Sequence, residues 1–313
     1  MGGGAAMNFS SMEYFKVLAE ERNFTRAAER LHITQQSLSS HIAGMEKELG
    51  SQLLVRRVPL TLTYAGEVML RYATDFQKVH NDMQREFCDI SQRQKGSLHV
   101  GAASARGQMI LPKTIALFQE SYPNISVKLT EGSNGELHQK LLKGTIDLAI
   151  AEFPENLPGI SLNDFYTEKN VLVIEKGLFA RCFTIDAKEC KSRLLAGDYS
   201  ALSVCPFVLG DIEDIDGRIG RDILKRAGIA NPIVTATSHN VGMLLQLSLC
   251  GVGACVCPQI IVQNMLTPQQ ADTIWIFELG EEAVSCIRFG CQVQSYQWSV
   301  IEKFIACAKA IVC

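Results

Sequence analysis

Apolar side chains recur at helical spacing in the stretch TQQSLSSHIAGMEKEL, which runs from residue 34 to residue 49. Its four large apolar residues follow one another at intervals of 4, 3 and 4 positions, as one stripe of an α-helix does. They are Leu38, Ile42, Met45 and Leu49. Thr34 can cap the N-terminus of this helix, and Gly50 suits its end. The pattern therefore predicts a helix that buries one face.

The opposite face of this helix carries short polar side chains. It contains Gln36, Ser40, Ala43 and Lys47, with Gln35 and Ser39 beside the first turn. Glutamine can pair with an adenine edge, serine can donate or accept a hydrogen bond, and alanine can contact a thymine methyl group. These residue types are suited to the major groove of DNA.

A shorter helix, RAAERL, comes just before, after a possible cap at Thr25, and only residues 32 to 34 separate the two helices. Two short helices joined by such a turn form a helix-turn-helix unit, whose second helix enters the major groove. A helix from Phe9 to Glu20, capped by Ser10 or Ser11, would support this pair. The alternative is a generic helical hairpin inside a globular core.

Two short β-prone runs, residues 53 to 55 and 60 to 63, follow on either side of a turn that contains Pro59. Arg56 and Arg57 lie in this turn. A hairpin with two arginines beside a recognition helix is typical of the wing of a winged helix, which contacts DNA phosphates and can reach the minor groove. The alternative is a solvated basic turn.

A nearly unbroken apolar seam then continues over seven turns of predicted helix. Its members are Tyr64, Val68, Tyr72, Phe76, Val79, Met83, Phe87 and Ile90. Nothing else in the first part of the chain is large enough to bury so long a stripe, so we expect a partner helix from a second subunit. The alternative is a long helix that packs on its own chain.

The pattern changes after the polar run SQRQKGS, residues 91 to 97. Short apolar runs then alternate with segments of helical spacing, which is typical of an α/β sheet with ligand sites at the carboxyl ends of its strands. The expected strands are residues 98–103, 125–130, 146–151, 171–175, 206–209, 233–236, 252–256, 274–277 and 287–293. The expected later helices are residues 217–228, 239–249 and 296–311.

Composition and charge exclude few classes of function. The net charge is −3, and residues 1–66 carry seven basic and six acidic side chains, so DNA binding must rest on local charge. The start MGGGAAM lacks the features of a secretory signal, so we expect residues 1–8 to be a disordered leader and the protein to be cytoplasmic. The most apolar segment, residues 244–257, is too short to span a membrane.

Candidate chemistry other than nucleic-acid binding is sparse. The eleven cysteines are scattered without a C-x-x-C pair, so we interpret them as buried reduced thiols rather than as a zinc site or a redox switch. The chain has no Gly-rich phosphate loop, no zinc-spaced cluster and no G-x-S-x-G elbow. We therefore expect no enzyme, no metal and no cofactor. A solute-binding module remains the alternative for the C-terminal two-thirds.

Several stretches together resemble one family. The segment YFKVLAEERNFTRAAERLHITQQSLSSHIAGMEKELGSQLLVRR, then LTLTYAGE, LTEGSNGELHQKLLKGTIDLAI and GVGACVCP, resemble the LysR-type transcriptional regulators, although residues 176–205 match poorly. The resemblance implies an α/β protein overall, with an N-terminal all-α winged helix-turn-helix, a long linker helix and a two-lobed effector-binding domain similar to periplasmic binding proteins. It also implies a homodimer, more often a homotetramer.

The same resemblance divides the chain and assigns residues. The expected parts are the leader (1–8), the DNA-binding domain (9–64), the linker and dimerisation helix (65–96), lobe I (97–166 and 270–313) and lobe II (167–269). The positions that match DNA-contacting residues are Thr25, Arg26, Thr34, Gln35, Gln36, Ser39 and Ser40, with Arg56 and Arg57 in the wing. Gln36 departs from the family, which very often has proline there, so we expect it to add a base contact at an atypical operator.

For the effector cleft, the expected lining residues are Ser104, Arg106, Ser133, Glu152, Val208, Leu209 and Ser238. Hydroxyls at helix N-termini with one guanidinium suit a carboxylate or phosphate, whereas Glu152 would repel an anion. A zwitterionic or neutral polar effector fits both residues. Peroxide-sensing members of the family carry a cysteine pair after the strand that corresponds to PFVL, and residues 211–226 contain no cysteine. We therefore do not expect a redox sensor.

Overall fold

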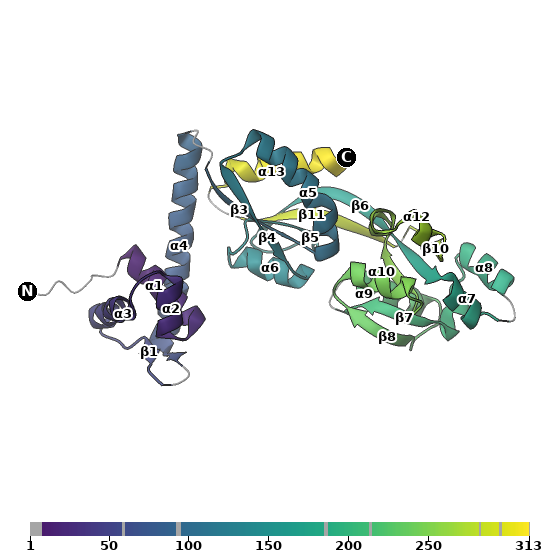
Figure 1. Ribbon diagram of the computed structural model, residues 1–313, viewed down its shortest axis with the longest axis horizontal. Helices are drawn as coiled ribbons and strands as arrows, with labels where there is room; N and C mark the ends of the chain where they lie inside the picture. Colours follow the sequence, from purple (N-terminus) through teal and green to yellow (C-terminus); the bar gives the residue numbers. More distant parts are fainter. Residues whose placement is uncertain are drawn as a thin grey trace, which may run out of the picture. The chain divides into compact units, whose positions relative to one another are not determined.

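The structure is a computed structural model that describes residues 8–57, 60–91, 95–184, 187–212, 215–281, 283–293 and 296–312. The chain forms two compact units, Met1–Gln92 and Arg93–Cys313 (Figure 1). The predicted leader lies outside the described residues except for Asn8.

The first unit has the predicted order of a helix, a helix-turn-helix pair, a hairpin and a long helix. The elements are α1 (Phe9–Glu21), α2 (Phe24–Arg30), α3 (Gln35–Leu49), β1 (Leu54–Val55), β2 (Thr61–Leu62) and α4 (Tyr64–Ile90). The two strands pair antiparallel, with Leu54 opposite Leu62. The tip of this hairpin, where we predicted a turn at Pro59, lies outside the described residues.

The helix caps differ from the prediction at two of three positions. Thr34 caps α3 as predicted, because its side chain accepts a hydrogen bond from the Ser37 amide. The predicted cap at Thr25 is wrong, because the Asn23 side chain caps α2 and accepts from the amides of Thr25 and Arg26. Asn8, rather than Ser10 or Ser11, caps α1. A short asparagine side chain placed just before the helix reaches the first free amides in both cases.

The core of the first unit joins the three short helices. Leu38, Ile42 and Met45 of the predicted α3 stripe are fully buried and pack with Phe15 and Leu18 of α1. The fourth member, Leu49, is 41% exposed, because the helix ends there and the chain turns at Gly50 with a φ of 63°. A left-handed φ favours glycine, so Gly50 ends the helix as predicted.

The second unit alternates strands and helices. It begins with β3 (Gly96–Ala102), α5 (Ser104–Ser121), β4 (Ile125–Glu131), α6 (Asn134–Leu142), β5 (Leu148–Glu152) and β6 (Ile160–Glu175). It continues with α7 (Lys176–Cys182), α8 (Ala187–Leu195), the 3₁₀ helix η1 (Ser200–Val204), β7 (Pro206–Gly210), α9 (Ile215–Arg226), β8 (Ile233–Ser238) and α10 (Val241–Leu249). It ends with β9 (Cys255–Pro258), α11 (Gln259–Met265), α12 (Pro268–Ala271), β10 (Ile274–Glu278), β11 (Val284–Gln292) and α13 (Ser299–Val312).

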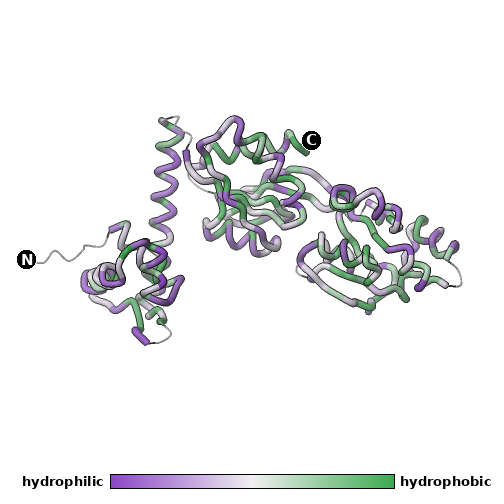
Figure 2. Tube along the Cα trace, viewed as in Figure 1, coloured by the Kyte–Doolittle hydropathy of each residue, from purple (hydrophilic) through white to green (hydrophobic). Residues whose placement is uncertain are grey.

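One long strand, β6, connects two lobes of this unit (Figure 1). Its residues 160–169 pair with β11 beside the parallel strands β5, β3 and β4, which form lobe I with α5, α6 and α13. Its residues 170–175 pair with β9 and β10 in lobe II. The separate parallel pair of β7 and β8 completes lobe II. Figure 2 shows hydrophobic residues concentrated along the central strands, whereas α4 alternates hydrophobic and hydrophilic residues.

The return of the chain to lobe I differs from the expected boundary at residue 270. Strand β10 pairs with Val171–Glu175, and Phe277 is buried in the core of lobe II. The chain re-enters lobe I only within β11. The expected boundary after residue 166 falls inside β6, because a single strand serves both lobes. The sequence pattern could not locate the division between the lobes, because it depends on which strands pair with each part of β6.

In the poorly matching stretch 176–205, the described residues form α7, α8 and η1 around the core of lobe II. No disulfide joins the cysteines in the described part of the chain, of which Cys205, Cys255, Cys257 and Cys291 are buried and Cys250 is exposed. Burial raises the pKa of Cys291 to about 12, and burial likewise raises the pKa of Cys205. These two thiols therefore stay protonated and packed. Within the described part of the chain, every helix is too short or too polar to cross a membrane.

Candidate functional sites

The outer face of α3 is the candidate DNA-reading surface. Gln35, Gln36 and Ser40 are exposed, Ser39 is half-buried, and Thr34 is exposed while its hydroxyl caps the helix. Because the other face holds the core of the unit, α3 is oriented with its amides and hydroxyls toward solvent. This arrangement leaves donors and acceptors available for base edges.

The start of α2 presents the next candidates. Thr25 and Arg26 are exposed. The Arg26 guanidinium donates through Nη2 to the backbone oxygen of Glu21 at 2.6 Å. Its Nε lies 3.6 Å from a carboxylate oxygen of the same glutamate. Arg26 is therefore held over the end of α1, at the first helix of the pair, which crosses the DNA backbone in this motif.

The wing is tied to α3 by a residue that the sequence pattern did not single out. Glu46 accepts hydrogen bonds through Oε1 from the amides of Leu53 and Leu54, and its Oε2 lies 3.1 Å from Nη2 of Arg56. Arg56 and Arg57 are both exposed. Glu46 thus fixes the position at which the hairpin leaves α3, and it partly neutralises one wing arginine.

A second residue that the pattern did not single out braces α3 against α1. His41 Nδ1 lies 3.0 Å from the hydroxyl of Ser11, which is fully buried. The His41 ring also meets Tyr14 edge-on, with 4.9 Å between ring centroids. No local pattern identifies these contacts, because the partners lie about thirty positions apart in the chain. They fix the angle at which α1 supports the recognition helix.

The apolar seam of α4 is largely exposed in the single chain. Val79 is 65% exposed, Phe87 64% and Ile90 71%, and Tyr72, Phe76 and Met83 are also exposed. The buried residues of α4 are Gly66, Met69 and Ala73, near its start, where Met69 and Ala73 join the core formed with α1, α2 and α3. The outer turns therefore present an apolar surface of the kind that forms an interface.

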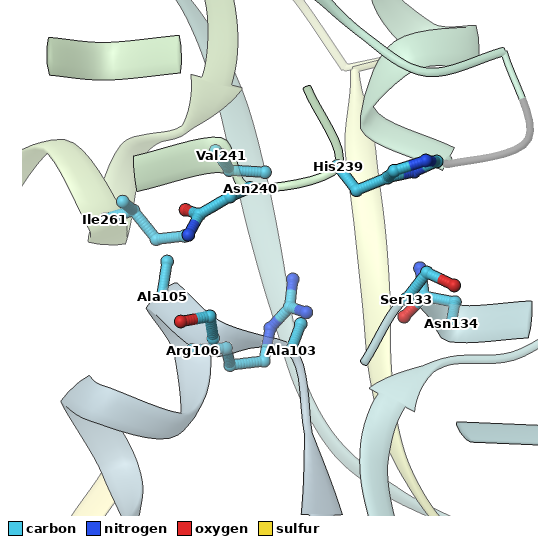
Figure 3. Close-up of a pocket in the computed structure, with 10 residues that line it drawn as sticks. Ala103, Ala105, Arg106, Ser133, Asn134, His239, Asn240, Val241 and Ile261 are labelled. Atoms are coloured by element: carbon cyan, nitrogen blue, oxygen red, sulfur yellow. The ribbon is translucent and has the colours of Figure 1, made fainter. Parts of the chain in front are cut away.

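An open pocket lies between the two lobes of the second unit (Figure 3). Its empty volume is about 410 Å³, including space open to solvent. Lobe I contributes residues at the N-termini of α5 and α6, and lobe II contributes the start of α10 and part of α11. The lining residues are Ala103, Ser104, Ala105, Arg106, Ser133, Asn134, His239, Asn240, Val241 and Ile261.

Arg106, which lines the pocket, forms an ion pair with Glu168. Figure 3 shows its side chain extending toward the middle of the pocket, with Ser133 and Asn134 on one side and Asn240 and Ile261 on the other. Its Nη2 donates to Oε1 of Glu168 at 2.5 Å, and the two side chains are only 5% and 2% exposed. The expected free guanidinium is therefore a buried ion pair without net charge.

The hydroxyls of Ser104 and Ser133 also line the pocket. Ser133 caps α6 reciprocally, because its hydroxyl accepts from the Glu136 amide at 3.3 Å and its own amide donates to Glu136 Oε2 at 2.8 Å. That backbone bond, followed by the bond to the hydroxyl, holds the pKa of Glu136 below its ordinary value. Glu152 is half-buried at the end of β5 and outside the pocket lining, and its amide donates to Asn134.

The three candidates from lobe II do not line the pocket. Val208 and Leu209 are 0% and 1% exposed and belong to the core, because β7 is covered on both faces. Ser238 accepts from the Asn240 amide at 3.0 Å and does not line the pocket. Its neighbours His239 and Asn240 do. For Ser238, the end of a strand was the available signal, and it missed the lining by one or two residues.

His239 brings an imidazole to the pocket from lobe II. Its Nε2 lies 3.8 Å from a carboxylate oxygen of Asp211. No group of three His, Cys, Asp or Glu side chains among the described residues is arranged to hold a metal ion. The pocket lining therefore offers amides, hydroxyls, this imidazole, aliphatic side chains and Arg106, whose charge Glu168 compensates.

Two family models match the chain. The "Bacterial regulatory helix-turn-helix protein, lysR family" matches residues 9–67, and the "LysR substrate binding domain" matches residues 91–310. The transcriptional activator IlvY of Salmonella typhimurium is 27% identical over 285 residues, which cover 88% of this chain and 90% of IlvY. The uncharacterized transcriptional regulator YcgK of Bacillus subtilis is 33% identical over 171 residues, which cover 54% of this chain and 53% of YcgK.

Solved structures share the fold. CbnR in complex with its target DNA is 24% identical with a TM-score of 0.64, and the match covers 97% of this chain and 99% of CbnR. A full-length OxyR variant from Pseudomonas aeruginosa is 20% identical with a TM-score of 0.68, and the match covers 98% of this chain and 95% of OxyR.

The two matched regions together span almost the whole described chain. The helix-turn-helix match leaves the alternative of a solute-binding module without a DNA-reading role unsupported. The family consists of transcriptional regulators rather than enzymes. This chain belongs to the LysR family of DNA-binding transcriptional regulators, with a winged helix-turn-helix and a two-lobed effector-binding domain.

Proposed function

We propose that α3 reads the operator in the major groove and that Gln36 makes a direct base contact. The exposed, polar outer face of α3 is the observation that carries this proposal. Gln35, Ser39 and Ser40 lie beside Gln36, while Thr25, Arg26, Thr34 and the wing arginines position the domain on phosphates. The protein acts on DNA in the cytoplasm.

The test is binding of the full-length protein to the DNA upstream of its own gene, over a salt series and with Gln36→Ala. A bidentate amide contact contributes about 1–3 kcal/mol of discrimination between bases. We expect Gln36→Ala to lower affinity for the preferred site and to relax preference at one base pair. Gln139→Ala, an exposed glutamine of α6, is the control and should bind as wild type does. Unchanged sequence preference in Gln36→Ala would remove Gln36 from the reading surface.

The exposed seam of α4 supports assembly through this helix, as a dimer and then a homotetramer. A second copy of α4 would cover the apolar residues that the chain leaves in solvent. A dimer would also supply two recognition helices for the two half-sites of an operator.

Sedimentation of a charge variant tests this assembly. We expect Val79→Glu to weaken the dimer by roughly 2 kcal/mol or more, since each subunit would bury an unpaired carboxylate. Asn81→Glu adds the same charge on another side of α4 and should leave the dimer intact. Equal sedimentation of Val79→Glu and wild type would exclude the seam as the interface.

The pocket between the lobes supports a zwitterionic or neutral polar effector. Arg106 and Glu168 cancel each other's charge, and most of the remaining lining is amide, hydroxyl and aliphatic. A simple dianion would find no uncompensated cation on Arg106. Tight binding of a dicarboxylate such as succinate by the wild-type protein would contradict this assignment.

A further inference from the structure

Glu46 lies in the last turn of α3, where the dipole of the helix disfavours a carboxylate. Its two oxygens have different partners in the hairpin. Oε1 accepts from the amides of Leu53 at 2.9 Å and Leu54 at 3.3 Å, whereas Oε2 accepts from Nη2 of Arg56 at 3.1 Å. One side chain therefore connects the recognition helix both to the backbone of the wing and to one of its cations.

The contact with the backbone holds the start of the hairpin in place. The side chains of Leu53 and Leu54 are 1% and 2% exposed and belong to the same core as Met45 of α3. Their amides donate to a charged acceptor, and hydrogen bonds of this kind are stronger than those between neutral groups. The backbone of β1 is thus fixed to α3 on two sides, by packing and by Oε1 of Glu46.

The other end of the hairpin is held at the same place. Thr63 follows β2, and it donates through its hydroxyl to the Gln52 oxygen at 2.6 Å and through its amide to the Leu53 oxygen at 3.0 Å. Its hydroxyl also accepts from the Gly66 amide and caps α4. A Cβ atom added to Gly66 would lie 2.1 Å from the Leu53 oxygen, so the start of α4 lies against β1. The base of the wing is therefore clamped between α3 and α4.

A clamped base couples the contacts of the wing to those of α3. Phosphate contacts fix the orientation of a protein on DNA but carry no sequence information themselves. A wing in a fixed position relative to α3 reaches its phosphate only when α3 lies in one register in the major groove. A hairpin that could swing would find a phosphate in any register. Oε1 of Glu46 therefore favours the matching site over unrelated DNA.

The ion pair has a different effect. The Arg56 side chain is 55% exposed, and Glu46 compensates its charge. A phosphate that binds Arg56 has to replace Oε2 of Glu46, whatever the sequence of the DNA. The pair therefore lowers affinity for all DNA to the same small extent.

We propose that Glu46 is a positioning residue that determines selectivity. Through Oε1 it holds the wing in register with α3, and through Oε2 it restrains Arg56 and so limits binding to unrelated DNA. This inference rests on the proposed reading of the operator by α3.

Two substitutions in the full-length protein separate these effects. Binding is measured at one salt concentration to the DNA upstream of its own gene and to an unrelated duplex of equal length. Glu46→Gln keeps an oxygen for both amides and loses the charge, so affinity for both duplexes should rise roughly twofold to fivefold at an unchanged ratio. Glu46→Ala loses both contacts, and the ratio of the two affinities should fall roughly tenfold, as on loss of one base contact.

Matched variants isolate the cause. Glu29→Gln removes the same charge from an exposed position of α2, so it should keep the ratio and raise affinity less than Glu46→Gln does. In an Arg56→Ala background, Glu46→Gln should raise affinity no more than Glu29→Gln does. Circular dichroism checks the fold of each variant. If Glu46→Ala does not fold, Glu46→Asp, whose shorter side chain cannot span both contacts, should show the same fall in ratio.

An unchanged ratio in Glu46→Ala, or an equal fall in Glu46→Gln, would overturn the positioning role. A full rise in affinity on Glu46→Gln in the Arg56→Ala background would overturn the restraint on Arg56. Equal binding of both duplexes by wild type would overturn the proposed function of α3, and this inference with it. Selective binding by wild type with an unchanged ratio in Glu46→Ala overturns only the role of Glu46.

Discussion

The two units each hold an arginine–glutamate pair, and the surroundings of the pairs are opposite. In the wing, Arg56 Nη2 lies 3.1 Å from Glu46 Oε2, and the Arg56 side chain is 55% exposed. In the effector-binding domain, Arg106 Nη2 lies 2.5 Å from Glu168 Oε1, and these side chains are 5% and 2% exposed. In the wing pair the arginine is therefore in contact with water while Glu46 is 13% exposed, whereas both side chains of the Arg106–Glu168 pair are shielded from water.

The two units therefore hold their charged side chains in different ways. Water screens the charge of the exposed Arg56, so a phosphate can replace Glu46 as its partner at little cost. The buried pair has lost its hydration, so neither partner can be removed without leaving a bare charge. Arg56 in the DNA-binding unit can exchange its carboxylate partner for a phosphate. Arg106 in the effector-binding domain stays paired with Glu168.

The largest expected effect comes from breaking the buried pair. Glu168→Ala leaves Arg106 without its carboxylate, and we expect a loss of about 3–5 kcal/mol in the free energy of unfolding of the second unit. Chemical denaturation followed by tryptophan fluorescence measures it, because both tryptophans, Trp275 and Trp298, lie in that unit.

The double variant Arg106→Met/Glu168→Leu is the control, and it should recover most of this loss because no charge is then buried. A loss below about 1 kcal/mol in Glu168→Ala would show that water reaches the pair and would remove the contrast with the wing.

A smaller effect is expected at the exposed pair. Arg56→Ala should change stability by less than about 1 kcal/mol. It should also weaken binding to DNA of any sequence and reduce the slope of log affinity against log salt by roughly one, since one phosphate contact is lost. Titrations at several salt concentrations measure both quantities. A salt slope equal to that of wild type would exclude Arg56 from contact with phosphate.

The smallest effect concerns the carboxylate that caps α6. The folded-state pKa of Glu136 lies below its ordinary value of 4.5, so the charged side chain stabilises the fold above that pH and the contribution is lost as pH falls through the folded pKa. Wild type should therefore be slightly more stable than Glu136→Gln at neutral pH. The difference should disappear in acid. Thermal unfolding between neutral pH and pH of about 3 measures it, and a difference that grows in acid would contradict the capping role.

Local order in the first unit followed from the sequence because its determinants are local. The spacing of Leu38, Ile42 and Met45 predicts the buried face of α3, and the polar residues on the other face are exposed for the same geometric reason. Thr34 and Gly50 end this helix through contacts within one turn. The bounds predicted for α4 from its seam, Tyr64 to Ile90, agree with the helix in the structure.

The contact between Arg106 and Glu168 depends on tertiary structure alone. Arg106 and Glu168 are separated by 62 positions, and nothing near either residue predicts that they meet. The family resemblance led us to expect Val208 and Leu209 in a loop at the cleft, yet packing on both faces of β7 buries them. Helical periodicity and capping act over three or four residues, so a single sequence displays them. Burial and pairing across lobes depend on which strands become neighbours, and that choice is made only when the whole chain folds.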